Sequence, residues 1–377
     1  MNKTKRIAYC LLSNKLHGAE KRVFKLALSS WFSSQKELSP FLFVNLELFN
    51  LAQMNTELSI LLKNNSSIIK IIPKPIINQR VFIHFWNMFF LTYFKIVYKI
   101  NILHSYLAAY HYSLILAGLG SKVVFEVTSP DVADTFISAH KNTRIESYLQ
   151  TRLFKINCVS DSVYNRFTKT QYIFSVLSKA LIYMNYPFVS VRALEINSLD
   201  DKTRFKNKEN VIICACRFIE RKNVLKFASV MKDILSNYTD WKIKILGKGP
   251  LEIELKKILH EYIENSRAYV GYTNSIIEEF SKSKIVVSLI KPDNYPSQSL
   301  FEAMATGNCI VVSNSGNSYR LVDKQNGILS DDFRSDMENL LSSPDKIYNF
   351  CVNSYNKFHS DYSENVYFEE LSYLYNN

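Results

Sequence analysis

The amino-acid sequence predicts an α/β protein of two domains, each built on a parallel sheet. Short apolar runs alternate with helix-length segments along nearly the whole chain, which is typical of successive βαβ units. The 377 residues exceed what one core usually supports, and 47% of them are hydrophobic, which is enough for two cores. Residues 184–210 are polar and aperiodic, and they are expected to connect the two domains.

The first half contains seven apolar runs of strand length. We expect strands at residues 7–12, 41–46, 68–72, 102–105, 122–127, 156–160 and 179–183. Apolar residues at helical spacing predict helices over 19–32 and 78–99. The second helix is rich in aromatic residues. It either lies buried at the centre of the domain or docks on a bilayer through its apolar face.

The second half repeats this pattern and ends in helices. We expect strands at residues 211–216, 241–246, 268–270, 284–289, 309–312 and 327–329. A short helix over 297–305, which Ser297 can cap, lies between the fourth and fifth of these strands. From residue 330 the chain is expected to be helical, closing with a helix over 363–375.

Glycine is scarce, so its positions indicate where the backbone needs freedom or close approach. Only nine glycines occur in the chain. Five of them, Gly18, Gly247, Gly249, Gly271 and Gly316, come where a predicted strand runs out toward the next helix. Ligands bind at this edge of a doubly wound sheet, so the sequence predicts a binding site there.

The positive charge is concentrated in the first half. Residues 1–190 hold 22 Lys and Arg against 9 Asp and Glu, whereas residues 191–377 hold 24 against 25. Such a basic half favours an anionic partner, namely membrane lipid, a polyphosphate-linked acceptor or nucleic acid, unless the charge serves solubility alone. No recognised nucleic-acid module is present, so we expect no nucleic-acid partner.

The cysteines and the longest apolar run indicate in which cellular compartment the protein is expected to work. The six cysteines lie mostly in apolar runs without a CxxC pair, which indicates reduced core thiols and a cytoplasmic protein. The longest aromatic and aliphatic run, residues 81–94, is shorter than the roughly 20 residues that a membrane-spanning helix needs. The apolar run after the basic start is also too short for a signal peptide.

Two cations and one carboxylate follow strands of the second half. Arg217 ends the strand at 211–216, and Lys222 follows before the next helix, so the pair can hold a diphosphate from two sides. Alternatively, Arg217 pairs with Glu220, and Arg221 and Lys222 are solvated loop charges. Glu302 lies one turn into the helix at 297–305, whose first amides favour an anion. It can accept hydrogen bonds from a ribose, or it lies on a solvated helix face.

Five segments carry a family resemblance. They are HGAEKRV (17–23), CRFIERKN (216–223), GKGP (247–250), VGYT (270–273) and NYPSQSLFEAMATGN (294–308). In motif order and over nearly its whole length, the chain resembles glycosyltransferase family 4, the retaining GT-B enzymes. The resemblance implies two Rossmann-like domains facing across a cleft, with 1–190 binding the acceptor and 191–360 the nucleotide sugar. It also implies that the final helix, 361–377, crosses back to the first domain.

The resemblance further implies a donor-binding site. Its residues would be Gly18, Arg217, Lys222, Gly271, Tyr272, Ser299, Leu300 and Glu302. Arg217 and Lys222 match the family's diphosphate pair, and Glu302 matches the glutamate that holds the ribose. Gly18 would let the donor lie close to the backbone. Gly271 and Tyr272 would lie beside the base, and the amides of residues 299–300 would face the phosphates.

Three departures from the family pattern lie near the sugar and the acceptor. The first acid of the E-x7-E motif would fall at Asn294, which follows Asp293, and either residue is expected to contact the donor sugar. Residues 128–131 replace a segment that often holds a histidine. Residues 185–188 replace the family's usual connector motif.

The resemblance implies a retaining, metal-independent hexosyltransferase without a cofactor. It would move a sugar from a nucleoside diphosphate to a saccharide acceptor, expected to be a lipid-linked unit of lipopolysaccharide or capsule. The enzyme would work in the cytoplasm, associated peripherally with the anionic inner face of the plasma membrane. The alternatives are a GT-B nucleotide-sugar epimerase and a non-catalytic subunit that binds a saccharide or a lipid carrier.

Overall fold

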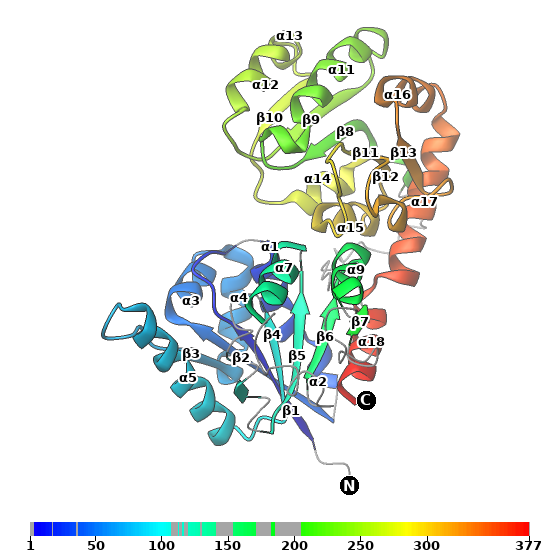
Figure 1. Ribbon diagram of the computed structural model, residues 1–377. Helices are drawn as coiled ribbons and strands as arrows, with labels where there is room; N and C mark the ends of the chain where they lie inside the picture. Colours follow the sequence, from blue (N-terminus) through cyan, green and yellow to red (C-terminus); the bar gives the residue numbers. More distant parts are fainter. Residues whose placement is uncertain are drawn as a thin grey trace. The chain divides into compact units, whose positions relative to one another are not determined.

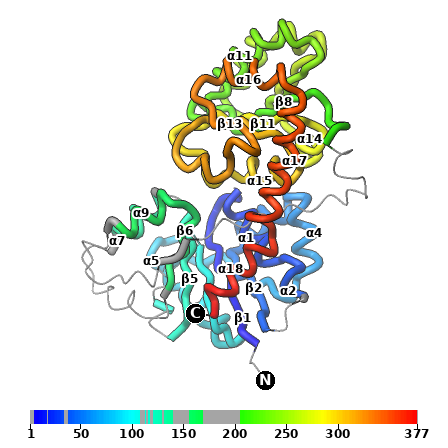
Figure 2. Tube along the Cα trace, turned by 90° about the vertical axis from the view of Figure 1, so that its right-hand side faces the viewer, coloured from blue at the N-terminus to red at the C-terminus, as the bar shows by residue number. Residues whose placement is uncertain are grey.

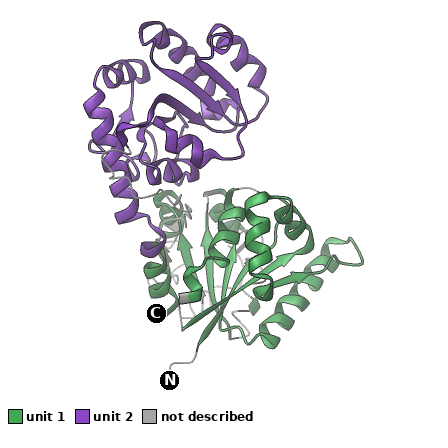
Figure 3. Cartoon of the chain, turned by 180° about the vertical axis from the view of Figure 1, so that it is seen from behind, with its two compact units in different colours: residues 1–190, 367–377 green, residues 191–366 purple. Residues whose placement is uncertain are grey.

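The computed structural model of the protein describes residues 4–16, 18–34, 37–106, 112, 115–116, 120–128, 130–140, 154–170, 182–184 and 205–376. The chain divides into two compact units (Figure 3): unit 1 comprises Met1–Ser190 and Tyr367–Asn377, and unit 2 comprises Val191–Val366. Each unit contains one parallel sheet covered by helices (Figure 1). The predicted α/β class is confirmed.

The sheet of unit 1 has the order β3-β2-β1-β4-β5-β6-β7. Its strands are β1 (Lys5–Leu11), β2 (Leu38–Asn45), β3 (Ile69–Ile72), β4 (Ile102–Tyr106), β5 (Lys122–Val127), β6 (Phe154–Cys158) and β7 (Ile182–Met184). Each overlaps a strand predicted from the sequence, although residues 179–181 of the last prediction lie outside the described residues. The strand predicted over 41–46 ends at Asn45, because the Asn45 side chain accepts the Leu48 amide at 3.0 Å and starts a helix.

The described helices of unit 1 that precede unit 2 are α1 (Gly18–Ala27), α2 (Trp31–Ser34), α3 (Leu46–Gln53), α4 (Thr56–Asn64), α5 (Arg80–Val97), α7 (Pro130–His140) and α9 (Asp161–Thr170). The prediction of one helix over 19–32 is wrong, since α1 ends at Ala27 and α2 begins at Trp31. The hydroxyl of Ser29 accepts the Trp31 amide at 3.1 Å, and this local bond competes with a continuous helix.

The helix α18 (Glu364–Asn376) docks on unit 1 (Figure 2). The ring of Phe368 stacks on that of Trp31, with centroids 4.0 Å apart and an interplanar angle of 1°. Tyr375 places its hydroxyl 2.6 Å from Nδ1 of the fully buried His104. Lys155 donates to the carbonyl of Leu374 at 2.7 Å, which places a positive charge at the helix C-terminus, where the dipole favours it. The core of unit 1 thus includes Tyr367, Phe368, Leu371, Leu374 and Tyr375 of α18.

The sheet of unit 2 has the order β10-β9-β8-β11-β12-β13. Its strands are β8 (Glu209–Ala215), β9 (Lys242–Leu246), β10 (Ala268–Gly271), β11 (Ser283–Ser288), β12 (Cys309–Ser313) and β13 (Gly327–Ser330). Its helices are α11 (Val224–Asn237), α12 (Glu252–Ile258), α13 (His260–Glu264), α14 (Ile276–Lys282), α15 (Gln298–Ala305), α16 (Phe333–Leu341) and α17 (Pro344–Asp361). All six predicted strands and the helical ending are confirmed.

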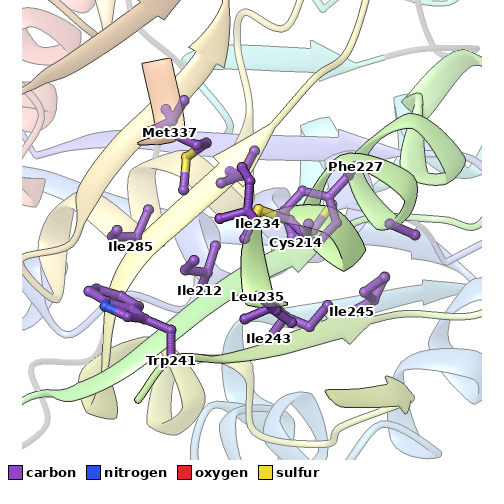
Figure 4. Packing of buried hydrophobic residues seen from close by; sticks show 14 of the residues in the cluster. Ile212, Cys214, Phe227, Ile234, Leu235, Trp241, Ile243, Ile245, Ile285 and Met337 are labelled. Carbon is purple, nitrogen blue, oxygen red and sulfur yellow. The ribbon is translucent and has the colours of Figure 1, made fainter. Parts of the chain in front are cut away.

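The core of unit 2 forms where α11 and α16 pack on the sheet (Figure 4). Ile212 and Ile243 contribute from neighbouring strands, and Phe227 and Met337 cover them from the helices; all four are at most 1% exposed. This apolar burial fixes the strands, so the loops at their carboxyl ends are held at one edge of a rigid sheet.

The structure also tests the predictions of reduced core thiols and of apolar runs too short to span a membrane. All six cysteines are free; five are buried and Cys216 is half-buried, which fits the prediction of core thiols. In the part of the chain that the structure describes, no helix combines the length and the apolar character needed to cross a membrane.

Candidate functional site

Hydrogen bonds join the loops that follow the strands of unit 2. The Phe218 amide, after β8, donates to the carbonyl of Lys248, after β9, at 3.0 Å. The Gly247 amide donates to the carbonyl of Gly271 at the end of β10 at 2.8 Å. A Cβ atom at position 247 would lie 1.9 Å from the carbonyl oxygen of Cys216, so this close approach requires glycine. Backbone hydrogen bonds therefore hold together the loops that carry Arg217, Lys222, Gly271 and Tyr272.

Asn223 fixes the loop that carries the two predicted cations. It adopts a left-handed conformation (φ 50°, ψ 30°) between the short 3₁₀ helix Glu220–Lys222 and α11. Its side-chain amide donates to the carbonyl of Leu289, just after β11, at 2.6 Å. Sequence analysis did not identify this residue. The signal was present, because asparagine is one of the few residues that tolerate a left-handed backbone.

Three cations gather after β8. Arg217 and Arg221 are exposed, and Lys222 is half-buried. Among the described residues Arg217 forms no ion pair, so the alternative of an Arg217–Glu220 pair is wrong. Burial, followed by the charge of Arg221, lowers the pKa of Lys222. The mutual repulsion of these charges would be relieved by a bound anion.

Nucleoside diphosphate binding is expected to weaken as the pH rises through the lowered pKa of Lys222. The Lys222 ammonium is charged below that pKa and loses its proton above it. Its attraction to the diphosphate is therefore present at lower pH and is lost as the pH rises through the pKa. Calorimetric titrations at a series of alkaline pH values measure the effect. The Lys222→Arg variant is the control, since arginine stays charged over this range. If the affinity of the wild type and of Lys222→Arg depended equally on pH, a contact between Lys222 and the diphosphate would be contradicted.

The N-terminus of α15 leaves backbone amides available. The expectation that Ser297 caps this helix through its side chain is wrong, because that side chain makes no cap hydrogen bond. The first amide bonded within the helix is that of Phe301, which donates to the Ser297 carbonyl at 3.1 Å. In an α-helix the amides before it, here Gln298, Ser299 and Leu300, have no intrahelical partner. These amides and the helix dipole can bind a phosphate.

Glu302 is held in place one turn further along α15. It is 9% exposed, so the alternative of a solvated helix face is wrong. The side-chain amide of Gln298 donates to its Oε1 at 3.0 Å, which orients the carboxylate. A buried, oriented carboxylate near an anion-binding helix end can accept hydrogen bonds from two neighbouring hydroxyl groups.

Asp293 joins the loop after β11 to the loop after β12. Its Oδ1 accepts the amides of Tyr295 at 2.9 Å and Asn317 at 3.0 Å, and its Oδ2 accepts the Asn317 side chain at 2.9 Å. Gly316 lies against it in a left-handed conformation (φ 56°), and a Cβ there would lie 2.4 Å from Asp293 Cγ. Both carboxylate oxygens of Asp293 thus accept hydrogen bonds within these two loops.

Asn294 differs from its neighbour in what its side chain contacts. It is 5% exposed, and its Nδ2 has no hydrogen-bond partner in the described structure. A buried amide without a partner is costly, and a ligand atom can supply the missing acceptor. Of the two residues predicted to contact the sugar, the geometry favours Asn294, and Asp293 holds the loop.

The Asn294→Ala variant is expected to weaken binding of a nucleoside diphosphate sugar by about tenfold, the value of one hydrogen bond. It should leave the affinity for the free nucleoside diphosphate unchanged, because the contact predicted for Asn294 is to the sugar. Asp293→Ala should instead lower the melting temperature of unit 2 and weaken both ligands. Calorimetry with each ligand separates these results. A parallel loss of both affinities in Asn294→Ala would exclude a contact to the sugar.

Tyr272 presents an aromatic face directly after β10. Its side chain is 53% exposed, and Lys248 Nζ lies 4.1 Å from the ring centroid. The Tyr272 carbonyl accepts the hydroxyl of Tyr269 at 3.3 Å, and Gly271 ends the strand just before it. An exposed ring of this kind can stack on a nucleobase.

The remaining predicted residues lie in unit 1 or outside the described residues. Gly18 begins α1, and a Cβ there would meet no atom within 4 Å, so the first turn of this helix is open at that point. Ser129 and residues 185–188 lie outside the described residues. Within the described ranges no three His, Cys, Asp or Glu side chains gather in a way that would hold a metal ion.

Comparisons with known proteins cover both units. Residues 195–346 match the family model "Glycosyl transferases group 1". No curated protein sequence matches the chain. Among solved structures, a glycosyltransferase from Rickettsia africae ESF-5 is similar, with a TM-score of 0.71, 12% identity, and coverage of 99% of this chain and 98% of that one.

Two further solved structures have the same architecture. Alr3699/HepE of Anabaena, solved with UDP and glucose, has a TM-score of 0.66, 13% identity, and coverage of 99% of this chain and 100% of that one. The lipopolysaccharide outer core galactosyltransferase WaaB has a TM-score of 0.63, 14% identity, and coverage of 97% and 98%. At such identities the likeness shows the fold. The chain therefore has the GT-B fold, with two Rossmann-like units each built on a parallel sheet.

Proposed function

We propose that this protein is a retaining glycosyltransferase of the family 4 type, which takes a sugar from a nucleoside diphosphate. The observation that carries the proposal is a set of polar groups on the loops and the helix that follow the strands of unit 2. It combines the cations Arg217, Arg221 and Lys222, the open amides of α15 and the buried carboxylate of Glu302. Cations and amides suit a diphosphate, and a carboxylate suits the vicinal hydroxyls of a ribose.

The proposed chemistry is a front-face transfer. Negative charge accumulates on the diphosphate as the glycosidic bond breaks, and Arg217, Lys222 and the amides before Phe301 stabilise it. The acceptor hydroxyl attacks from the side on which the diphosphate leaves, and the departing phosphate oxygen takes its proton. This route requires no protein nucleophile, metal ion or cofactor. Asn294 would orient the sugar.

The proposed acceptor is a lipid-linked saccharide of a surface polysaccharide, bound by unit 1. Support comes from the excess of 13 positive charges over residues 1–190 and from WaaB, which acts on the lipopolysaccharide outer core. We place the enzyme in the cytoplasm, at the anionic inner face of the membrane.

A panel of nucleoside diphosphate sugars tests the proposal. One donor is expected to raise the melting temperature by about 5 °C at a hundredfold excess over its Kd, from about 2.7 kcal/mol of linkage. The same donor should be hydrolysed slowly in water, and NMR spectra recorded before the released sugar mutarotates would show retention of the anomeric configuration. A panel in which no nucleotide stabilises the protein would contradict the donor site.

The same incubation distinguishes the two alternative functions. Conversion of the donor alone into an epimeric sugar would identify an epimerase. Donor binding without hydrolysis, and without transfer to any saccharide offered, would identify a binding subunit. Either outcome would contradict the proposed glycosyltransferase activity and identify the alternative function instead.

A further inference from the structure

The helix α5 of unit 1 presents an apolar face to solvent. The side chains on this face are 47% to 72% exposed: Val81, Phe85, Phe89, Tyr93, Ile96 and Val97. Their spacing of three or four residues places them along one side of the helix. A soluble surface rarely leaves so many large apolar side chains together without a partner.

The opposite side of α5 anchors the helix in unit 1, at the side of the sheet that carries β2 and β3 (Figure 1). Leu91 is fully buried and Phe94 is 7% exposed, and both belong to a core cluster with Phe43 of β2 and Ile72 of β3. The predicted alternative of a wholly buried central helix is therefore wrong, and docking on a bilayer stays a prediction for the exposed side. Because the buried side fixes the helix, the exposed side is a preformed surface.

The loop before α5 extends this surface. The indole of Trp86 donates to the carbonyl of Pro73 at 2.9 Å, which ties residues 73–79 to the helix. The loop adds Ile76, which is 84% exposed, and Ile77, which is 46% exposed. We call residues 73–79 together with the exposed face of α5 the α5 surface.

The segment of sequence that contains the α5 surface carries charges of a single sign. Between Glu57 and Glu126 the sequence contains seven Lys and Arg and no Asp or Glu. Lys74 and Arg80 lie at the start of the α5 surface, and Lys95 and Lys99 at its end. An apolar stripe with cations at its ends matches the acyl region and the phosphates of an anionic bilayer.

We propose that the α5 surface docks this protein on an anionic lipid bilayer. The helix lies in the plane of the interface, with Phe85 and Phe89 in the acyl region and Lys74 and Arg80 at lipid phosphates. This inference rests on the peripheral membrane association proposed above and assigns it to specific residues. A second copy of the chain fits the surface less well, because two such surfaces would bring cations together.

Vesicle sedimentation tests the apolar part of the α5 surface. Vesicles of phosphatidylcholine and phosphatidylglycerol should bind the protein, and pure phosphatidylcholine should bind it much less. Phe85→Gln with Phe89→Gln is expected to lower the partition coefficient by at least about tenfold, because binding scales with buried apolar area. The control is Ile253→Gln, which alters a side chain 83% exposed in unit 2 and should change nothing.

Reversal of charge tests the basic part. Lys74→Glu with Arg80→Glu should abolish the preference for phosphatidylglycerol, whereas the control Lys257→Glu, at an exposed position of α12, should have a much smaller effect. Insertion has a direct readout. The fluorescence added by Phe89→Trp should be quenched by brominated lipid, and that added by Ile253→Trp should not.

Three outcomes would overturn the assignment. One is equal binding by the wild type and the Phe85→Gln, Phe89→Gln variant, and another is equal quenching at positions 89 and 253. The third is dimerisation without lipid, in analytical ultracentrifugation, that the double variant abolishes, since it would make the partner a second copy. Nucleotide-induced thermal stabilisation is measured in the same variants. A failed docking with intact nucleotide binding leaves the donor site of unit 2 standing.

Discussion

The Lys222→Ala variant is expected to lose transferase activity by about two to three orders of magnitude, the usual effect of removing one group that stabilises a leaving oxyanion. Lys222 is held by the 3₁₀ turn that Asn223 ties to the end of β11, and the charges of Arg217 and Arg221 lie beside it. Because the diphosphate gains charge as the sugar leaves, the loss should fall mainly on kcat.

Glu302→Ala should also abolish transfer, mainly through weaker nucleotide binding, because its carboxylate is proposed to hold the ribose. Steady-state kinetics and thermal shift with the donor measure both variants. Lys226→Ala, which removes an exposed lysine from α11, is the matched control and should keep full activity. Full activity in both Lys222→Ala and Glu302→Ala would refute the donor site.

The Phe368→Ala variant is expected to destabilise unit 1 by about 3–5 kcal/mol, as for other large aromatic residues truncated in a core. Phe368 is fully buried on α18, stacked on Trp31 and in edge contact with Phe32. Its removal leaves a cavity between the end of the chain and α2. Chemical denaturation, followed by tryptophan fluorescence, measures the loss.

Tyr373→Ala is the matched control for this prediction. It lies on the same helix but is 62% exposed, so its replacement should change the stability by no more than about 0.5 kcal/mol. The transition of unit 2 should be the same in both variants. Equal stabilities of the two variants would show that α18 contributes little to the core.

The arrangement of strands followed from the sequence because buried parallel strands are short, continuous apolar runs. All six strands of unit 2 could be located in this way. Local hydrogen bonds between side chains and the backbone were harder to predict from the sequence. The break between α1 and α2 depends on the Ser29 hydroxyl, and the end of β2 depends on the Asn45 cap. These bonds outweigh hydrophobic spacing over only a few residues, so they shift the ends of elements without changing the fold.

The candidate donor site could be assembled from the sequence where a residue type and its place in the chain were enough. Lys222 follows β8 and Glu302 lies one turn into α15, and both stay predicted contacts of the donor. Asn223 was missed because its role depends on a backbone angle and on a bond to Leu289, residues distant in sequence. The separate roles of Asp293 and Asn294 depend on which side chain turns toward Asn317. Two adjacent polar residues in a loop carry no periodicity that could decide this.

The docking of α18 also determines when unit 1 can be completed during synthesis. The hydroxyl of Tyr375 bonds to that of Tyr9, 366 positions earlier in the chain. A ribosome makes β1 before unit 2 and α18 after it, so unit 1 can be completed only after unit 2 has been made. Unit 2 is one continuous segment, so it can form its core before α18 has been made. In the nascent chain the core of unit 1 therefore lacks the side chains of α18 until this helix emerges.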